Sequence, residues 1–171
     1  SAELTVQIMK RLRYPDKFSK LVTWLVAEHM RFAPMLISGE KTLLRWVRSE
    51  ATSGTFRNQA ELTYAYKQLV EVFLADMEAT HARKNPTLME NGRALGEQVI
   101  ELAREKMPVA NSDLAISGKD LLEIIPQEQI KNALSYLLER VQSGNLPNEK
   151  EALLTAMQKH LQKTLKGNDD E

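Results

Sequence analysis

Apolar residues recur at helical spacing along almost the whole chain, and no segment shows the sustained alternation typical of a half-buried strand. The clearest stretch runs from residue 16 to residue 33, where one apolar stripe occupies positions i, i+3, i+4, i+7, i+8 and i+11. Its members are Phe18, Leu21, Val22, Leu25, Val26 and His29. We therefore predict an all-α fold, an irregular array of about seven to eight helices.

Prolines, glycines and small polar residues divide this pattern into separate helices. Asp16 is expected to cap the second helix, and Ala33 with Pro34 to end it. The predicted helices before residue 108 are 3–13, 16–33, 40–50, 58–83 and 86–107. The long fourth helix should bury Leu62, Tyr66, Leu69, Val70, Phe73 and Met77.

The last third of the chain contains several residues of the types that begin or end helices. Ser117 and Asp120 form an S-x-x-D capping box that opens a short helix. Pro126 suits the first turn of the next helix, and Gly144 stands where a left-handed C-cap belongs. Asn148 is expected to cap the final helix.

The turn at 108–112 separates a helical body at residues 1–108 from a C-terminal helical tail subdomain at residues 109–171. The first residues enter a helical pattern almost at once, so we expect the chain to be a fragment excised from a larger protein. No apolar run approaches the roughly 18 residues that a membrane span needs, and no secretory signal is visible. Because the chain has no cysteine, we expect a reducing compartment and a cytoplasmic protein.

The net charge is zero, but the charge is unevenly distributed. Residues 10–57 hold 10 Lys and Arg against 4 Asp and Glu, whereas residues 58–144 hold 9 against 13. A basic first third indicates an anionic partner, although charge alone leaves open that these cations only solvate helix faces. Lys41, Arg45 and Arg48 recur at i, i+4 and i+7, so they share one helix face suited to phosphate contacts.

No catalytic or metal-binding constellation is visible. The stretch SGKD resembles the end of a phosphate-binding loop, but the upstream glycine is missing and Asp120 stands where a hydroxyl belongs. His29, His81 and His160 form no metal-ligand spacing with one another, and we expect His29 to be a satisfied core histidine. Asp76 is either a buried partner of a basic residue or a boundary carboxylate, and the sequence does not separate the two.

A family resemblance rests on two segments of the last third. The stretch DLAISGKDLLEI, followed by a helix and by LLERVQSGNLPNEKEALL, resembles the C-terminal region of bacterial tRNA nucleotidyltransferases, the CCA-adding enzymes and the related poly(A) polymerases. The residues that match the family elements L-x-G-x-D-L and V-x-x-G-x-L-x-N are Leu114, Ile116, Gly118, Lys119, Asp120, Leu121, Val141, Gly144, Leu146, Asn148 and Leu153.

The resemblance extends more loosely over the body. The stretch LRYPDKFSKLVTWLVAEHMRF looks like the helix pair that follows the head and neck of that family. LLRWVRSE and FLADMEATHARKN are similar to the next helices of members with an HD-like middle region, so the body looks like a remnant of that region. The chain departs from the family at IIPQEQIKNAL, where members usually have a P-G-P-like loop and a glycine and where only Pro126 is retained.

The resemblance implies an RNA-holding role. In that family a catalytic head with a glycine-serine loop and a D-x-D pair uses magnesium with CTP or ATP, and this sequence matches neither element. We expect no catalytic residue, metal ligand or cofactor in this fragment, and the N-terminal catalytic domain of the same protein as a partner. By the same resemblance, the body and tail hold tRNA or other RNA by its backbone. Phosphate contacts are expected from Lys41, Arg45 and Arg48, with Lys119 and Lys131 as weaker candidates.

Two other functions stay open. The first is a helical protein-interaction module without an RNA role, which exposed apolar patches would favour. The second is a degenerate HD-type phosphohydrolase, which needs metal ligands that the sequence does not show. Whether the parent protein adds CCA or poly(A) is also left open by the sequence.

Overall fold

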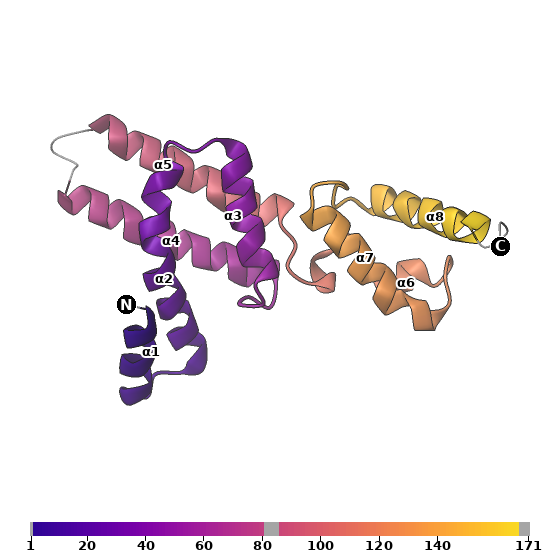
Figure 1. Cartoon of the computed structure of the whole chain (residues 1–171), viewed down its shortest axis with the longest axis horizontal. Helices are drawn as coiled ribbons and strands as arrows, with labels where there is room; N and C mark the ends of the chain where they lie inside the picture. The colour runs from indigo at the N-terminus through magenta and orange to yellow at the C-terminus, as the bar shows by residue number, and fades with distance from the viewer. Residues whose placement is uncertain (1, 81–85, 168–171) are drawn as a thin grey trace. The chain divides into compact units, whose positions relative to one another are not determined.

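The architecture of the described residues is all-α, as predicted. The computed structural model describes residues 2–80 and 86–167, with side chains up to Lys163, and this part of the chain contains no strand (Figure 1). The α-helices are α1 Ala2–Arg11, α2 Asp16–Met35, α3 Glu40–Thr52, α4 Gln59–Thr80, α5 Pro86–Glu101, α6 Gly118–Leu121, α7 Ile130–Gln142 and α8 Lys150–Gly167. A π-helical segment, Leu102–Lys106, continues α5, and short 3₁₀ turns at Asn111–Asp113 and Gln127–Gln129 precede α6 and α7.

The chain forms two compact units. Unit 1 comprises Ser1–Trp46 and Thr63–Leu102, and unit 2 comprises Val47–Leu62 and Ala103–Glu171. Each unit is therefore built from two separate stretches of sequence. The domain boundary predicted at residue 108 stays a prediction.

The core of unit 1 is built around α4 and is rich in aromatic rings. The apolar face predicted for the long helix is confirmed, because Tyr66, Leu69, Val70, Phe73 and Met77 in unit 1 are all buried, as is Leu62, which belongs to unit 2. Tyr66 meets Trp24 and Trp46 edge-on, with ring centroids 5.4 and 5.2 Å apart. Phe32 of α2 packs against Phe73 at 4.5 Å. Such edge-to-face and tilted pairs add to the free energy of burying the rings.

The buried face of α2 differs from the predicted stripe. Its buried residues are Trp24, Glu28 and Phe32, whereas Phe18 at the start of the stripe is exposed. The middle of the stripe, from Leu21 to Val26, is half-buried, and the short helix α1 packs against α2 (Figure 1). The prediction that His29 is a core histidine was wrong, because it is exposed and its Nδ1–H donates to a backbone carbonyl of its own helix.

The predicted start and end of α2 also need correction. Pro15 holds the N-cap position and Asp16 is the first helical residue, with no side-chain cap. Pro34 lies inside the last turn, which ends at Met35. A proline in the last turn costs the helix one backbone hydrogen bond, because proline has no N–H group. The cost is limited here, since α2 ends one residue later, at Met35.

The helices α4 and α5 approach closely at two glycines. A Cβ placed on Gly96 would lie 2.6 Å from Cγ1 of Val70, and one placed on Gly92 would lie 3.0 Å from Cε1 of Phe73. Gly92 and Gly96 lie on the same face of α5, because they stand four residues apart, and neither has a side chain there. The side chains of Phe73 and Val70 of α4 occupy the space that side chains at these positions would need.

Unit 2 has its own apolar core, formed by α6, α7, α8 and the turns before them. Its fully buried members include Leu121, Leu137 and Leu153. Val141 of α7 and Met157 of α8 are buried in the same cluster, and the neighbouring leucines are half-buried against it. In the loop where the sequence departs from the family pattern, Pro126 is the N-cap residue of the 3₁₀ turn Gln127–Gln129, which leads into α7.

Two helices end in the same C-cap motif with different residues. After α7, Gly144 has φ +73°, the Asn145 N–H donates to the Arg140 carbonyl, and the Gly144 N–H donates to Val141. This pair of bonds is a Schellman motif, so the predicted left-handed C-cap is confirmed. After α1, Arg13 occupies the corresponding position with φ +55°, and Tyr14 and Arg13 donate to the carbonyls of Met9 and Lys10.

Replacing Arg13 by glycine is expected to stabilise the chain by about 0.5–1 kcal/mol, because a residue with a Cβ is strained in the left-handed region. Urea denaturation followed by circular dichroism would measure the change. The matched control is Arg11→Gly, which removes the same charge inside α1 and should destabilise by about 1 kcal/mol. Equal destabilisation by both variants would contradict the strain argument.

Candidate nucleic-acid interface

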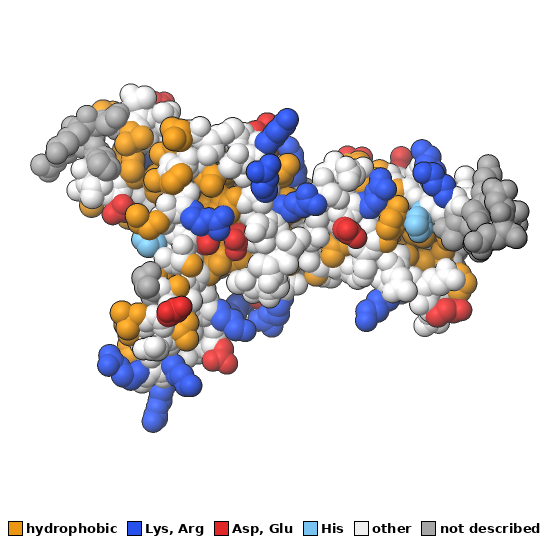
Figure 2. All heavy atoms as spheres, in the orientation of Figure 1, with side chains coloured by type: hydrophobic (Ala, Val, Ile, Leu, Met, Phe, Trp, Pro, Cys, Tyr) orange, Lys and Arg blue, Asp and Glu red, His pale blue; other side chains and the backbone are white. Residues whose placement is uncertain are grey.

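The three cations predicted on one helix face lie on α3 and are exposed. Lys41, Arg45 and Arg48 point away from the opposite face of this helix, where Leu43 and Trp46 are buried. Among the described residues, none of the three forms an ion pair with a carboxylate. Figure 2 shows Lys and Arg side chains over the surface where α3 lies. The positive charge of this face is therefore open to an anionic ligand.

A buried carboxylate fixes the first half of α3. Glu28 of α2 is 7% exposed, and the Trp46 Nε1–H donates to its Oε2 at 2.8 Å. Arg31 donates to both oxygens of Glu28 at 2.9 and 3.1 Å and lies 5.8 Å from the centre of the Trp46 ring. Burial of a charge is costly unless it is paired and hydrogen-bonded, and these contacts meet that condition. They orient α3, and with it Lys41 and Arg45.

Sequence reasoning missed Glu28. The signal that could have found it is its spacing, because Trp24, Glu28 and Phe32 stand four residues apart and so lie on one face of α2. A carboxylate between two large aromatic residues at this spacing indicates a polar partner on the neighbouring helix.

The two weaker candidates lie in unit 2. Lys119 in α6 and Lys131 in α7 are both exposed, and no ion pair to either is found among the described residues. Next to Lys119, Asp120 is engaged in the predicted capping box, accepting from the N–H and the hydroxyl of Ser117 at 2.8 and 2.7 Å. The sequence prediction of this cap is confirmed.

Asp120 also ties α6 to the start of α8. The Lys150 ammonium donates to its Oδ1 at 2.5 Å. The hydrogen bond from Lys150, with those from Ser117, holds the pKa of Asp120 well below its usual range, and the same contact raises the pKa of Lys150. Asp120 is therefore a structural anion, and its negative charge disfavours a phosphate beside Ser117.

A second connection between the two motif segments runs through Asn148. Its amide donates to the Asp113 carbonyl and accepts from the Ala115 N–H, both at 2.8 Å. The prediction that Asn148 caps the last helix was wrong, because its side chain is used in these contacts and α8 begins at Lys150. We call the set Asp113, Ala115, Asp120, Asn148 and Lys150 the tail clasp.

The carboxylate of Asp113 organises the backbone around the tail clasp. Its Oδ2 accepts three backbone N–H groups, from Gln59 at 2.9 Å, Val109 at 3.0 Å and Ala110 at 2.9 Å. Backbone donors away from regular structure need partners, and a single carboxylate oxygen supplies them here. Within unit 2, the hydrogen bond from Gln59 links the stretch Val47–Leu62 to the turn that contains Asp113.

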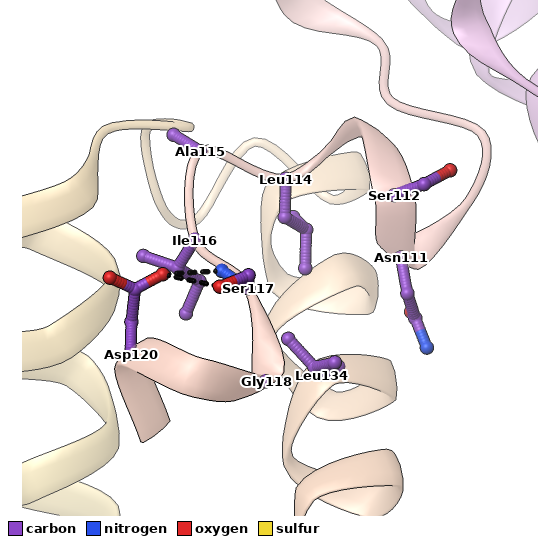
Figure 3. A pocket seen from close by; sticks show the side chains of 9 residues that line it. All are labelled: Asn111, Ser112, Leu114, Ala115, Ile116, Ser117, Gly118, Asp120 and Leu134. Carbon is purple, nitrogen blue, oxygen red and sulfur yellow. Dashed lines mark hydrogen bonds between the residues drawn. The ribbon is translucent and has the colours of Figure 1, made fainter. Parts of the chain in front are cut away.

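A hollow of about 470 Å³ opens at residues 111–120. Figure 3 shows its lining, and the Asp120 carboxylate in it points at Ser117. The lining residues are Asn111, Ser112, Leu114, Ala115, Ile116, Ser117, Gly118, Asp120 and Leu134. They include no Lys or Arg. The absence of a side chain at Gly118 lets Ile130 pack closely against its backbone, since a Cβ there would lie 3.0 Å from Cγ2 of Ile130. The hollow therefore lacks the chemistry of a phosphate loop.

The described residues contain no group of three or more His, Asp or Glu side chains that could hold a metal ion. His160 stacks on Tyr136 with ring centroids 4.2 Å apart, and His81 lies outside the described residues. Asp76 is exposed, so the interpretation of it as a buried partner of a basic residue was wrong.

In the described part of the chain, no helix is long and apolar enough to cross a bilayer.

The described residues form an all-helical protein that presents cations on α3 and in which the tail clasp joins the two motif segments of the last third. The family follows from comparison with known proteins. Residues 5–157 match the family model described as tRNA nucleotidyltransferase domain 2, and the chain belongs to this family. The match confirms the relationship to the helical region of tRNA nucleotidyltransferases that the motifs of the last third indicate. Searches of curated proteins and of solved structures find no match.

Proposed function

We propose that this chain is the RNA-holding helical part of a tRNA nucleotidyltransferase or poly(A) polymerase. It binds tRNA or another RNA by its phosphates and positions the 3′ end for a catalytic domain of the same protein. The observation that carries the proposal is the exposed face of Lys41, Arg45 and Arg48 on α3, in a chain of this family.

The geometry of α3 suits a nucleic-acid backbone. Seven residues of α-helix rise about 10 Å, so the cations form a short row rather than a single point. Contacts of Lys and Arg to phosphates supply affinity without reading sequence, which a domain that serves many tRNAs requires. Lys119 and Lys131, exposed in unit 2, are weaker candidates for further contacts.

The chemistry belongs to the catalytic domain in this proposal. Magnesium and CTP or ATP act there, and the described residues of this chain present no cluster that could hold the metal. The chain contributes orientation, which lowers the entropic part of the activation barrier without touching the reacting atoms.

Reversing the charge of the α3 face is expected to weaken tRNA binding by about 100-fold at low salt. The variant is Lys41→Glu with Arg45→Glu and Arg48→Glu. Because each phosphate contact contributes about 0.9 to the slope of log K against log salt, the slope should fall by about 2–3. Fluorescence anisotropy with labelled tRNA between low and moderate salt measures both quantities.

The matched control makes the same kind of change on another helix. Lys159→Glu with Lys163→Glu reverses two exposed cations of α8 and should leave the affinity within about threefold. The α3 variant reverses three cations and the control two, so if the losses of binding free energy stand in about that ratio, only net charge matters and the assignment to α3 is wrong. If the unaltered chain binds no tRNA at low salt, and pulldown recovers a protein partner instead, the protein-interaction alternative replaces this proposal.

A further inference from the structure

Two aromatic rings stand exposed at the connection between α1 and α2. Tyr14 and Phe18 are each 47% exposed, and their ring centroids lie 5.4 Å apart at an interplanar angle of 45°. Large aromatic side chains are normally buried, as are the rings of Trp24, Phe32, Trp46, Tyr66 and Phe73 that contact one another in the core of unit 1. This exposed pair, which we call the aromatic elbow, is not explained by packing within the chain.

The backbone holds the aromatic elbow in place. The Tyr14 N–H donates to the Met9 carbonyl as part of the C-cap of α1, and Arg13 takes a left-handed conformation. Pro15 then fixes φ at −55°, and the Ser19 hydroxyl donates to the Tyr14 carbonyl at 3.4 Å. Two rings on a backbone restrained at both sides lose little entropy when a flat ligand stacks on them.

The charge around the aromatic elbow is strongly positive. Residues 10–20 hold five Lys and Arg against one Asp, and Lys10, Arg11 and Arg13 at the end of α1 are all exposed. Figure 2 shows Lys and Arg side chains gathered at this end of α1, beside hydrophobic side chains. Lys10 and Arg11 also face the negative end of the α1 dipole, but Arg13 lies beyond the helix and has no such role.

We propose that the aromatic elbow binds unpaired nucleotides of an RNA, with bases stacked on Tyr14 and Phe18 and phosphates held by Lys10, Arg11 and Arg13. This inference rests on the proposed function and adds a second surface, which takes single-stranded RNA rather than the helical backbone. Aromatic rings flanked by cations are the usual platform for single strands, since every base has a face to stack and every nucleotide a phosphate. A second copy of the chain is disfavoured as the occupant, because it would bring the same cations together.

The test uses the whole chain and two RNA probes, a single strand of about 12 nucleotides and a duplex of the same length. Tyr14→Ala with Phe18→Ala should weaken single-strand binding by about tenfold or more and change duplex binding by less than about threefold. Tyr14→Phe with Phe18→Tyr retains both rings and should retain binding. Tyr64→Ala removes a 54% exposed ring from α4, a helix that contributes no residue to the aromatic elbow, and should have no effect.

The outcomes separate this inference from the proposed function. If reversal of the α3 cations weakens duplex binding while the alanine pair leaves single-strand binding unchanged, the aromatic elbow is overturned and the proposed function stands. If no RNA binds, both are overturned. Loss of binding to phosphatidylserine vesicles, or of self-association in sedimentation, without loss of RNA binding would assign the rings to a lipid surface or a second copy and would also overturn it.

Discussion

Replacing Gly96 by valine is expected to destabilise the chain by about 3 kcal/mol, one of the two largest effects that the structure predicts. The Cβ alone would lie 2.6 Å from Cγ1 of Val70, closer than non-bonded carbon atoms approach, and 3.3 Å from Cγ2, a tight contact. Val70 is β-branched and cannot rotate away without leaving its preferred rotamer, so α4 and α5 must separate. On an exposed helix face the loss of a glycine would by itself stabilise, which makes the sign a sharp test.

The control for this variant is Ala94→Val, on the exposed side of the same helix. It introduces the same side chain without the clash and should cost less than about 1 kcal/mol. Adding Val70→Ala to Gly96→Val should recover part of the loss, because the space that the new side chain needs is then provided. Gly96→Val with the stability of Ala94→Val, measured by urea denaturation, would disprove the close approach.

Removal of the Asp113 carboxylate should cost about 3 kcal/mol or more. One oxygen of this residue accepts three backbone N–H groups, and Asp113→Ala leaves all three without it. Hydrogen bonds to a charged group contribute about 1.5–3 kcal/mol each, and part of this is recovered by water at half-buried positions. The loss should appear as a lower denaturation midpoint and as faster hydrogen exchange of the Gln59, Val109 and Ala110 amides.

Asp76→Ala is the matched control for Asp113→Ala. Asp76 is an exposed residue of α4, and its substitution should change the free energy of unfolding by less than about 0.5 kcal/mol. Asp113→Asn keeps one oxygen but places an amide donor near the same N–H groups, so we expect an intermediate loss. An effect of Asp113→Ala no larger than that of Asp76→Ala would show that the carboxylate does not hold these turns.

The helices themselves were predictable, because periodicity depends on many residues at once. The all-α class, the buried face of α4 and the C-cap at Gly144 are confirmed. Single polar residues were less predictable. Asn148 has the type and position of a helix cap, but its amide bonds instead to Asp113 and Ala115, which are more than thirty positions away in the sequence. Local preference is a weak guide where a distant backbone group competes for the same side chain.

In the candidate site, too, the positions that follow from helical spacing were predictable, and a single polar contact was not. The exposure of Lys41, Arg45 and Arg48 follows from helical spacing, since Leu43 and Trp46 had to take the other face. Glu28 was not predicted as a structural residue, because a carboxylate among aromatic residues looks like an interruption of the apolar face. Only the structure shows that Trp46 donates to it. The packing of α1 against α2 likewise depends on a tertiary contact that no local pattern contains.

The two-stretch construction of unit 2 limits how this protein can be cut. The backbone passes from one unit to the other three times, at 46/47, 62/63 and 102/103. A fragment that begins at Ala103 contains Asp113 but not Gln59, one of its three donors. A fusion made at a single point before residue 103 would therefore not carry the whole of unit 2 to another protein. During synthesis, residues 47–62 leave the ribosome long before the partners that complete their unit.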